Sequence, residues 1–282
     1  MLAKKKKPVN TSSLRVGASR GGIFSRHRSL RPGDFQSPLI RYFNIKLHLV
    51  EADEVYTVPE CHRDLTIRNL KNRLELLVGI PVNFQRLHYL DRVDLSDHSM
   101  FKHNDIIPGG TISMRIWPED SWGQLVTAAV TGNNKKIVVA GGAMSSTFST
   151  AYSTSLGPAE RSEWLAHRTF VALFINARRG RLDAVDFLIQ NGADLAYKTP
   201  LGRTALHVAV TSGHCDCIDL LLSYGAKISD EDNDGQNAVM LARLWGQKEC
   251  ERRLFRYQWK LRAGASAQLA AIKVKSVDRV EP

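Results

Sequence analysis

The chain has 282 residues, a hydrophobic fraction of 43% and a formal net charge of +11, which is enough chain for more than one hydrophobic core. It contains no run of about 18 apolar residues and no apolar stretch after its N-terminal lysines, so we expect neither a membrane span nor a secretory signal. Four cysteines are too few for a disulfide framework and favour a reducing, intracellular compartment.

The positive charge is concentrated at the two ends of the chain. Residues 1–41 carry ten Lys or Arg residues against one acid, and residues 248–282 carry nine against four, which leaves −3 for the middle. We therefore expect a disordered basic tail at 1–41 and a second basic tail without periodic pattern at 259–282. The four lysines at 4–7 have the form of a nuclear import signal, with a solvated tail as the alternative. The expected location is the cytoplasm, the nucleus or both.

Residues 42–117 show the apolar periodicities of several strands and one helix. Thr66 precedes a series of apolar residues at helical spacing, and this predicted helix ends near Gly79. Apolar residues at alternate positions predict the strands. The expected strands lie at 43–49, 55–58, 85–90, 93–95 and 110–117.

This order of elements resembles the ubiquitin-like β-grasp fold. The resemblance is carried by Gly79-Ile80-Pro81, Gln85-Arg86-Leu87, Leu95 and the alternating strand Thr111-Ile112-Ser113-Met114-Arg115-Ile116. A ubiquitin-like domain is therefore expected over residues 42–117.

Two departures from the ubiquitin pattern bear on function. The paired glycines Gly109-Gly110 precede the last strand of this region instead of following it as in ubiquitin, so we do not expect conjugation to other proteins. The positions of ubiquitin's apolar receptor patch are matched by His88, Arg115 and the acidic turn at 51–54. Because docking would desolvate these groups without partners, the resemblance does not predict binding of ordinary ubiquitin receptors.

The second half of the chain repeats with a period of 33 residues. The glycines at 180, 213 and 246 keep this spacing, as do the leucines at 188, 221 and 254. Each stretch predicts a short helix, a glycine-ended turn and a second helix, a unit that cannot bury its own apolar faces without neighbours. These units resemble ankyrin repeats, whose T-P-L-H-x-A signature appears here as Thr204-Ala205-Leu206-His207-Val208-Ala209.

We expect three ankyrin repeats at 163–258, preceded at 118–162 by a degenerate capping helix and a Gly/Ser/Thr-rich insertion whose loop covers 141–157. The resemblance gives His207 a structural, hydrogen-bonding role. The predicted fold class is α+β multidomain, with a ubiquitin-like β-grasp domain followed by a short all-α ankyrin solenoid. The combination resembles ankyrin repeat domain-containing proteins that carry such a domain before the repeats, a family that implies protein interaction without known catalysis.

No motif predicts catalysis, a cofactor or a metal. The acidic run at 230–235 resembles the start of a calcium loop, but its twelfth position is Leu241 instead of a bidentate glutamate. Cys215 and Cys217 are too close together for a usual zinc half-site, and the repeat pattern places them in or near the core. The chain is therefore not expected to be an enzyme.

The sequence places candidate partner-binding residues at two repeat hairpins, because ankyrin stacks bind proteins through hairpin tips and the concave face. The tips cover 196–203 and 229–236, and neighbouring tips of opposite charge could orient a partner carrying both signs. Solvation alone is the alternative explanation of their polarity. The candidate residues are Tyr197, Lys198, Leu201, Arg203, Asp230, Asp232, Asp234 and Gln236.

The leading functional hypothesis is a non-enzymatic adaptor or scaffold that binds an unidentified protein, with no membrane partner. One alternative is association of the basic tails with nucleic acid or another acidic surface. Another is an adaptor of the ubiquitin pathway that acts through the ubiquitin-like domain. The last repeat carries a row of basic residues at helical spacing: Lys248, Arg252, Arg256 and Lys260. We interpret this row as the solvated outer face of a capping repeat, and a site for an anionic partner is the less favoured alternative.

Overall fold

The computed structural model describes residues 40–90 and 94–277, with the backbone alone over 264–277, and all of them belong to one compact unit. The lysines at 4–7 and nearly all of the expected N-terminal tail lie outside the described residues. The same holds for 91–93 and for the last five residues of the expected C-terminal tail.

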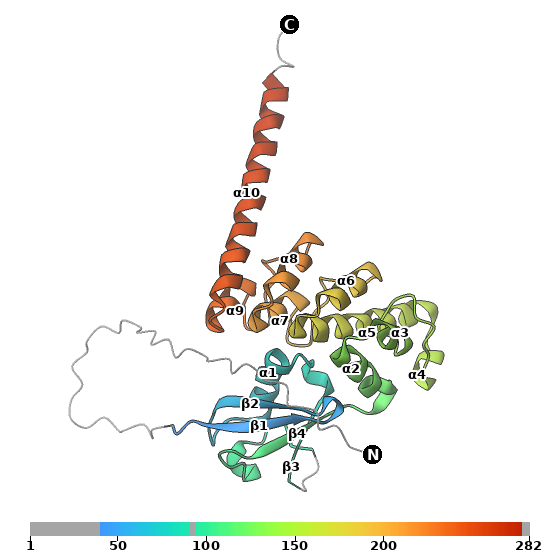
Figure 1. Ribbon diagram of the computed structural model, residues 1–282, viewed down its shortest axis with the longest axis vertical. Helices are drawn as coiled ribbons and strands as arrows, with labels where there is room; N and C mark the ends of the chain where they lie inside the picture. Colours follow the sequence, from blue (N-terminus) through green and yellow to red (C-terminus); the bar gives the residue numbers. More distant parts are fainter. Residues whose placement is uncertain (1–39, 91–93, 278–282) are drawn as a thin grey trace, which may run out of the picture. The chain divides into compact units, whose positions relative to one another are not determined.

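The first half of the described chain forms a four-stranded mixed sheet (Figure 1). Its order is β2-β1-β4-β3, in which β1 and β4 run parallel and the other neighbours are antiparallel. This arrangement confirms the β-grasp prediction. The strands are β1 (Phe43–Leu49), β2 (Glu54–Cys61), β3 (Gln85–Tyr89) and β4 (Thr111–Ile116).

One helix covers the inner face of the sheet. α1 (Ile67–Val78) starts at Thr66, whose side chain accepts a hydrogen bond from the Asn69 amide at 3.2 Å, as an N-cap should. Its buried leucines pack with the inward residues of the strands, including Ile45, Leu47 and Met114. The expected short strand at 93–95 is not formed at its described residues Asp94 and Leu95.

Four short 3₁₀ turns connect these elements and lead into the helical region. They are η1 (Val50–Ala52), η2 (Val82–Phe84), η3 (Phe101–Asn104) and η4 (Glu119–Ser121).

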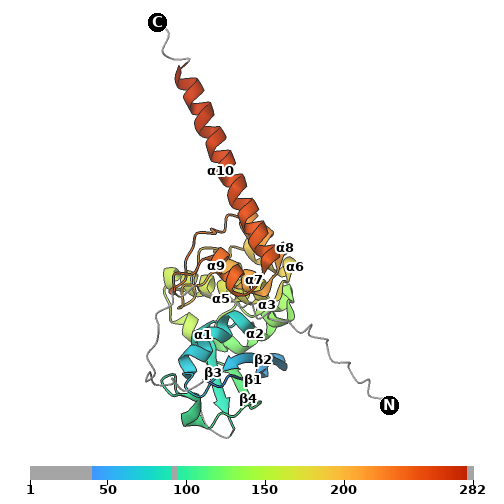
Figure 2. The ribbon, with the colours of Figure 1, turned by 90° about the vertical axis from the view of Figure 1, so that its left-hand side faces the viewer.

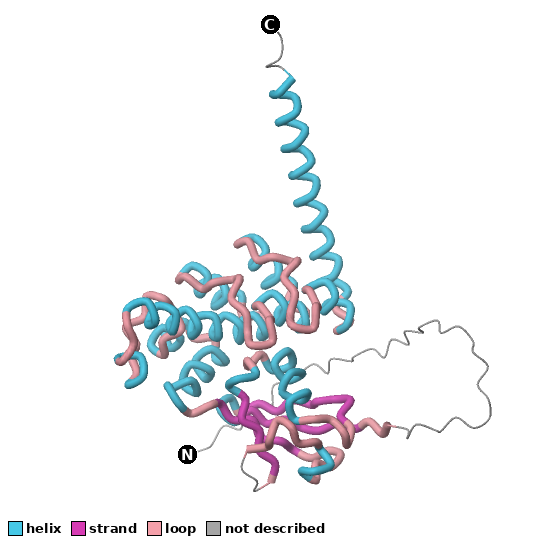
Figure 3. The backbone as a smooth tube through the Cα atoms, turned by 180° about the vertical axis from the view of Figure 1, so that it is seen from behind, coloured by secondary structure: helices cyan, strands magenta, loops and turns pink. Residues whose placement is uncertain are grey.

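The second half consists of helix pairs joined by loops that follow one another along the stack (Figure 3). The pairs α7/α8 and α9/α10 belong to successive repeats, and α5/α6 precedes them. The helices are α2 (Trp122–Thr131), α3 (Asn134–Val139), α4 (Ala151–Thr154), α5 (Pro158–Arg179), α6 (Leu182–Gln190), α7 (Ala205–Ser212), α8 (Cys215–Ser223), α9 (Ala238–Leu244) and α10 (Lys248–Val277).

Three features of the helical region differ from expectation. The short α4 lies within the segment 141–157 that was expected to be loop, and α5 has 22 residues where one short repeat helix was expected. α10 continues to Val277 through the expected C-terminal tail. Residues 262–277 contain five alanines, and alanine favours helix because it loses no side-chain entropy, even without an apolar period.

The β-grasp half and the repeats pack together through α1. This helix contacts α5 and α7, the first helices of two successive units, and it lies between the sheet and these helices (Figure 2). Gly79 marks the closest approach: it ends α1 with a φ of 80°, and a Cβ added there would lie 2.6 Å from Cβ of Arg178 on α5. Glycine is therefore required twice at this position, by the left-handed backbone and by the neighbouring helix.

Replacing Gly79 by alanine should destabilise the protein more than the matched change Gly109→Ala. Both glycines have a positive φ, 80° and 76°, but Gly109 has open space where Gly79 meets Arg178. Backbone strain costs about 1–2 kcal/mol at either site, and overpacking adds about 1–3 kcal/mol at Gly79 alone. Urea unfolding of both variants measures the difference, and equal losses would contradict the packing of α1 on α5.

Candidate functional site

A buried carboxylate lies at the centre of the junction between the two halves of the chain. Glu75 on α1 is fully buried; its Oε1 accepts a hydrogen bond from Thr199 Oγ1 at 2.7 Å and its Oε2 accepts one from the Val82 amide at 2.7 Å. Burial raises the pKa of Glu75, against the opposing effect of the Arg203 guanidinium. A residue of the first repeat hairpin is thus bonded directly to the helix of the β-grasp half.

Arg203 joins this carboxylate to the next repeat hairpin. Its side chain is only 5% exposed, and its Nη1 donates to the Asn72 carbonyl of α1 at 2.7 Å and lies 3.6 Å from Glu75 Oε1. Its Nε donates to Asp232 Oδ2 at 3.5 Å. One guanidinium therefore contacts two buried carboxylates that come from different parts of the fold.

Asp232 and His207 hold the second hairpin in shape. Asp232 Oδ1 accepts the amides of Asp234 at 3.0 Å and Gln236 at 2.9 Å. The Thr204 amide donates to His207 Nδ1 at 3.1 Å, which places the proton on Nε2, 3.2 Å from the Gln236 carbonyl. Burial lowers the pKa of His207, so the ring is neutral and structural, as the ankyrin resemblance implied.

The last turn of α5 makes a second contact with the β-grasp half. Arg178 donates from Nε to the Leu76 carbonyl at 2.9 Å and from Nη2 to the Leu77 carbonyl. These carbonyls belong to the C-terminal turn of α1, where cationic side chains are favoured. Arg179 donates to Glu54 Oε2 of β2 at 2.8 Å. The arginines of α5 therefore bind both α1 and the edge strand.

A wall of aromatic rings adjoins this junction. Phe84 and Trp122 have ring centroids 4.3 Å apart, Trp122 and His167 lie at 5.2 Å, and His167 stacks on Tyr197 at 5.6 Å. Burial and the neighbouring Arg168 guanidinium lower the pKa of His167, so this ring is neutral at pH 7. The wall runs without a break from the β-grasp half, through α2 and α5, to the first hairpin.

The eight predicted partner-binding residues fall into three groups by exposure. Arg203 and Asp232 are buried, at 5% and 6% exposure, and their charged groups are bonded within the chain. Lys198 and Asp234 are exposed. The half-buried members are Tyr197, Leu201, Asp230 and Gln236.

The two hairpin tips lie against each other. The Asn233 amide donates to the Leu201 carbonyl at 2.9 Å, and Asn233 Nδ2 donates to the Pro200 carbonyl at 2.9 Å. Lys198 Nζ reaches the Glu231 carbonyl at 2.9 Å. The tips therefore form one bonded surface, with a lysine on one hairpin and acids on the next.

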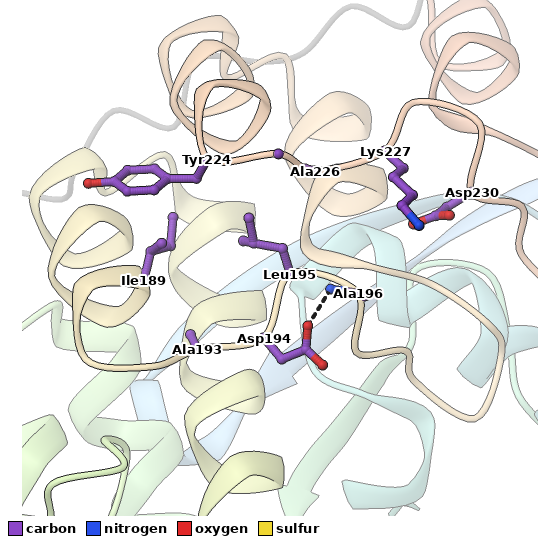
Figure 4. A pocket seen from close by; sticks show the side chains of 10 residues that line it. Ile189, Ala193, Asp194, Leu195, Ala196, Tyr224, Ala226, Lys227 and Asp230 are labelled. Carbon is purple, nitrogen blue, oxygen red and sulfur yellow. Dashed lines mark hydrogen bonds between the residues drawn. The ribbon is translucent and has the colours of Figure 1, made fainter.

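A shallow depression of about 320 Å³ separates the bases of the same two hairpins. Figure 4 shows Tyr224 near one end of it and Lys227 with Asp230 near the other. The carboxylate of Asp194 accepts from the Ala196 amide at 2.8 Å and so serves the turn. Of the predicted residues, Asp230 alone lines this depression.

Sequence reasoning missed the residues that join the two halves. Glu75 could have been noticed as a lone acid in the apolar run Leu74-Glu75-Leu76-Leu77, and Arg178 and Arg179 as a basic pair at the end of a repeat helix. Neither pattern indicates which residues Glu75 or the arginine pair would contact. The aromatic wall has no sequence signal at all, because its rings come from four separate segments.

The outer face of the sheet carries the residues at ubiquitin's receptor positions. His88 Nε2 lies 3.1 Å from Asp94 Oδ1, and Arg115 is exposed on the neighbouring strand. Arg86 on the same face is bonded to Asp94 at 2.8 Å through its Nε. This face is therefore polar and charged.

Cys217 is buried, as the repeat pattern predicted. Cys215 is half-buried, with its Sγ 3.0 Å from that of Cys250, and both are free thiols. Among the described residues, no cluster of three or more His, Cys, Asp or Glu is arranged to hold a metal ion. No helix in the same part of the chain has the length and apolar character needed to cross a membrane.

Arg203→Ala should lower the free energy of unfolding by about 3–5 kcal/mol, because it leaves Glu75 and Asp232 buried without their shared counter-charge. Lys198→Ala, five residues away on the same hairpin but exposed, should change it by less than about 0.5 kcal/mol. Urea unfolding followed by tryptophan fluorescence compares the two. Similar small losses would show that Arg203 does not hold the junction.

The raised pKa of Glu75 predicts how its contribution to stability depends on pH. Because the native state holds the Glu75 proton more tightly than the unfolded chain does, this contribution is fully present below the unfolded pKa. It is lost as pH rises through the native pKa. The unfolding free energy of the wild type minus that of Glu75→Gln should therefore fall as the pH rises above about 4.5, the ordinary pKa of a glutamate. A difference that rises with pH would mean that Arg203 outweighs burial.

Comparison with protein-family models identifies both halves of the chain. A model of the ubiquitin-like domain matches residues 47–105, and a model of ankyrin repeats in three copies matches residues 171–266. Comparison with curated proteins gave no match to the chain. Both kinds of domain are typically non-catalytic and support a general role in protein interaction. The chain thus carries an N-terminal ubiquitin-like domain followed by a region of ankyrin repeats.

Proposed function

We propose that the protein is a non-enzymatic adaptor that binds a protein partner through the exposed side of its two neighbouring hairpin tips. The observation that carries the proposal is the single bonded surface at these tips, with Lys198 on one hairpin and Asp234 on the next. Neighbouring charges of opposite sign orient a partner that carries the complementary pair.

The buried network beneath the tips supports this role. Arg203 and Asp232 fix the two hairpins relative to each other and to α1, so the exposed side chains above them are held in one arrangement. A surface that is ordered before binding loses less conformational entropy when the partner arrives. The proposed contact residues are therefore Lys198, Leu201, Asp230, Asp234 and Gln236, on a frame made by Arg203 and Asp232.

The concave side of the stack is partly occupied within the chain itself. α1 contacts α5 and α7, and Gly79 leaves no space between α1 and Arg178. A partner would meet the tips and their rims before it met the first helices of these two units. We therefore propose that the partner binds at the tips, and that the ubiquitin-like domain stays packed on α5 and α7 when it binds.

Charge reversal at the exposed tip residues should release such a partner without unfolding the protein. Lys198→Glu and Asp234→Lys change exposed groups, each expected to weaken binding about two- to fivefold, with a larger loss for the pair. Crosslinking with mass spectrometry on the full-length chain identifies the bound proteins. Binding measurements with the recovered partner then give the ratio of the variant dissociation constant to that of the wild type.

Lys46→Glu is the matched control, because Lys46 is an exposed lysine on the outer face of β1 in the ubiquitin-like domain. It should leave partner binding unchanged. If Lys46→Glu reduces binding as much as Lys198→Glu does, the surface in use is not the hairpin tips.

A further inference from the structure

A second, larger cavity opens where the ubiquitin-like domain meets the first helices of the repeat region. It encloses about 610 Å³, within the range of sites that hold a ligand or a few side chains of a peptide. One side is the aromatic wall described above, and the exposed rings of Trp117 and Tyr152 stand at its edge. Its walls are therefore largely aromatic faces.

Among the residues that the structure describes, every formally charged one that lines this cavity is an acid. The four are Glu119, Asp120, Glu160 and Glu163. The Asp120 carboxylate is bonded to groups inside the protein: its Oδ2 accepts a hydrogen bond from Trp164 Nε1 at 2.6 Å and lies 3.5 Å from Arg168 Nη1. Glu119, Glu160 and Glu163 are exposed, so three carboxylates remain at the solvent side of the aromatic wall.

Of the three exposed carboxylates, Glu163 is the best candidate to bind a cation. Glu163 lines the cavity together with the stacked rings of His167 and Tyr197. Burial raises the pKa of Tyr197, and the Glu163 carboxylate adds to this effect. Glu160 accepts from the Gly157 amide at 3.0 Å through one oxygen, which fixes its position at the start of α5. A carboxylate next to a neutral aromatic stack is an arrangement that attracts a cation.

The interior of the chain already uses the same chemistry directly behind the wall. The buried Arg168 guanidinium lies 4.6 Å from the ring centroid of Trp122, 4.8 Å from that of Phe148 and 4.9 Å from that of Trp164. Asp120 balances its charge. The positive charge behind the wall is thus compensated. Arg86, whose guanidinium lies 5.1 Å from the Trp117 ring centroid, is paired with Asp94, which leaves the three outer carboxylates as the exposed charges that line the cavity.

We propose that this cavity binds a lysine- or arginine-rich segment of a protein partner, with one cationic side chain held between the aromatic wall and the carboxylates of Glu119, Glu160 and Glu163. Tyr197 alone of the tip residues lines this cavity, and none of the proposed tip contacts Lys198, Leu201, Asp230, Asp234 and Gln236 does, so either site can fail without the other.

Binding of a fluorescein-labelled peptide, with three arginines spaced by glycine and serine, tests the proposal on the full-length chain. Fluorescence anisotropy should show binding that weakens with salt. Glu119→Gln with Glu163→Gln should reduce affinity about five- to tenfold, and Tyr152→Ala, at a ring that is 58% exposed, about two- to fivefold. Unchanged binding in both variants would overturn the proposal.

The pair Asp230→Asn with Asp234→Asn removes the same charge from the hairpin tips and is the matched control. It should leave the affinity for the peptide unchanged and lower the affinity for the partner that binds the tips. The cavity and the tips are therefore tested independently. Equal losses in the cavity and tip variants would show non-specific attraction and overturn the cavity site.

The chain's own basic N-terminal segment is the competing occupant. A full-length variant with alanine at the four lysines 4–7 should bind the peptide as the wild type does. If its affinity rises, and the two glutamine changes abolish the rise, the cavity is filled in cis and the assignment to a partner is wrong.

Discussion

The architecture depends on one guanidinium that shares its charge between two domains. Arg203 lies between Glu75 of the ubiquitin-like domain and Asp232 of the next repeat, and all three side chains are buried. Such a group adds little net stability over a well-packed apolar contact, but leaving either carboxylate without it is strongly unfavourable. The consequence is positional: Arg203 reaches both acids only when α1, the first hairpin and the second hairpin keep one arrangement.

The same constraint explains why ankyrin-type residues take unusual duties here. The hairpin threonine Thr199 accepts the Arg203 amide within its own turn and also donates its hydroxyl to Glu75. Arg178 satisfies carbonyls at the end of α1 that would otherwise face another helix. Because backbone carbonyls and a carboxylate accept these bonds, the junction is polar at its centre and aromatic at its side, where Phe84 meets Trp122.

Local patterns in the sequence predicted most of the elements, but not the full lengths of α5 and α10 or the burial of Arg203. Thr66 and Gly79 mark α1, and the 33-residue glycine period marks the repeats, because caps and periodicity are local. The length of α5 was missed although Gly157 and Pro158 mark its start, because the repeat pattern predicts only a short helix before Gly180. The continuation of α10 was missed because an alanine-containing segment can continue a helix without an apolar period. The burial of Arg203 could not be foreseen either. A charged residue in a hairpin tip is normally solvated, and only the tertiary position of Glu75 makes it a buried one.

That burial also determines which surfaces a partner can use. To occupy the faces of α5 and α7 that α1 contacts, a partner would have to displace α1. Glu75, Arg203 and Asp232 would then exchange their mutual contacts for water or for groups of the partner. The exposed tip residues Lys198 and Asp234, and the carboxylates at the rim of the aromatic cavity, can be bound without any such exchange. Recognition that leaves the domain junction intact therefore does not use the faces of α5 and α7 that α1 covers.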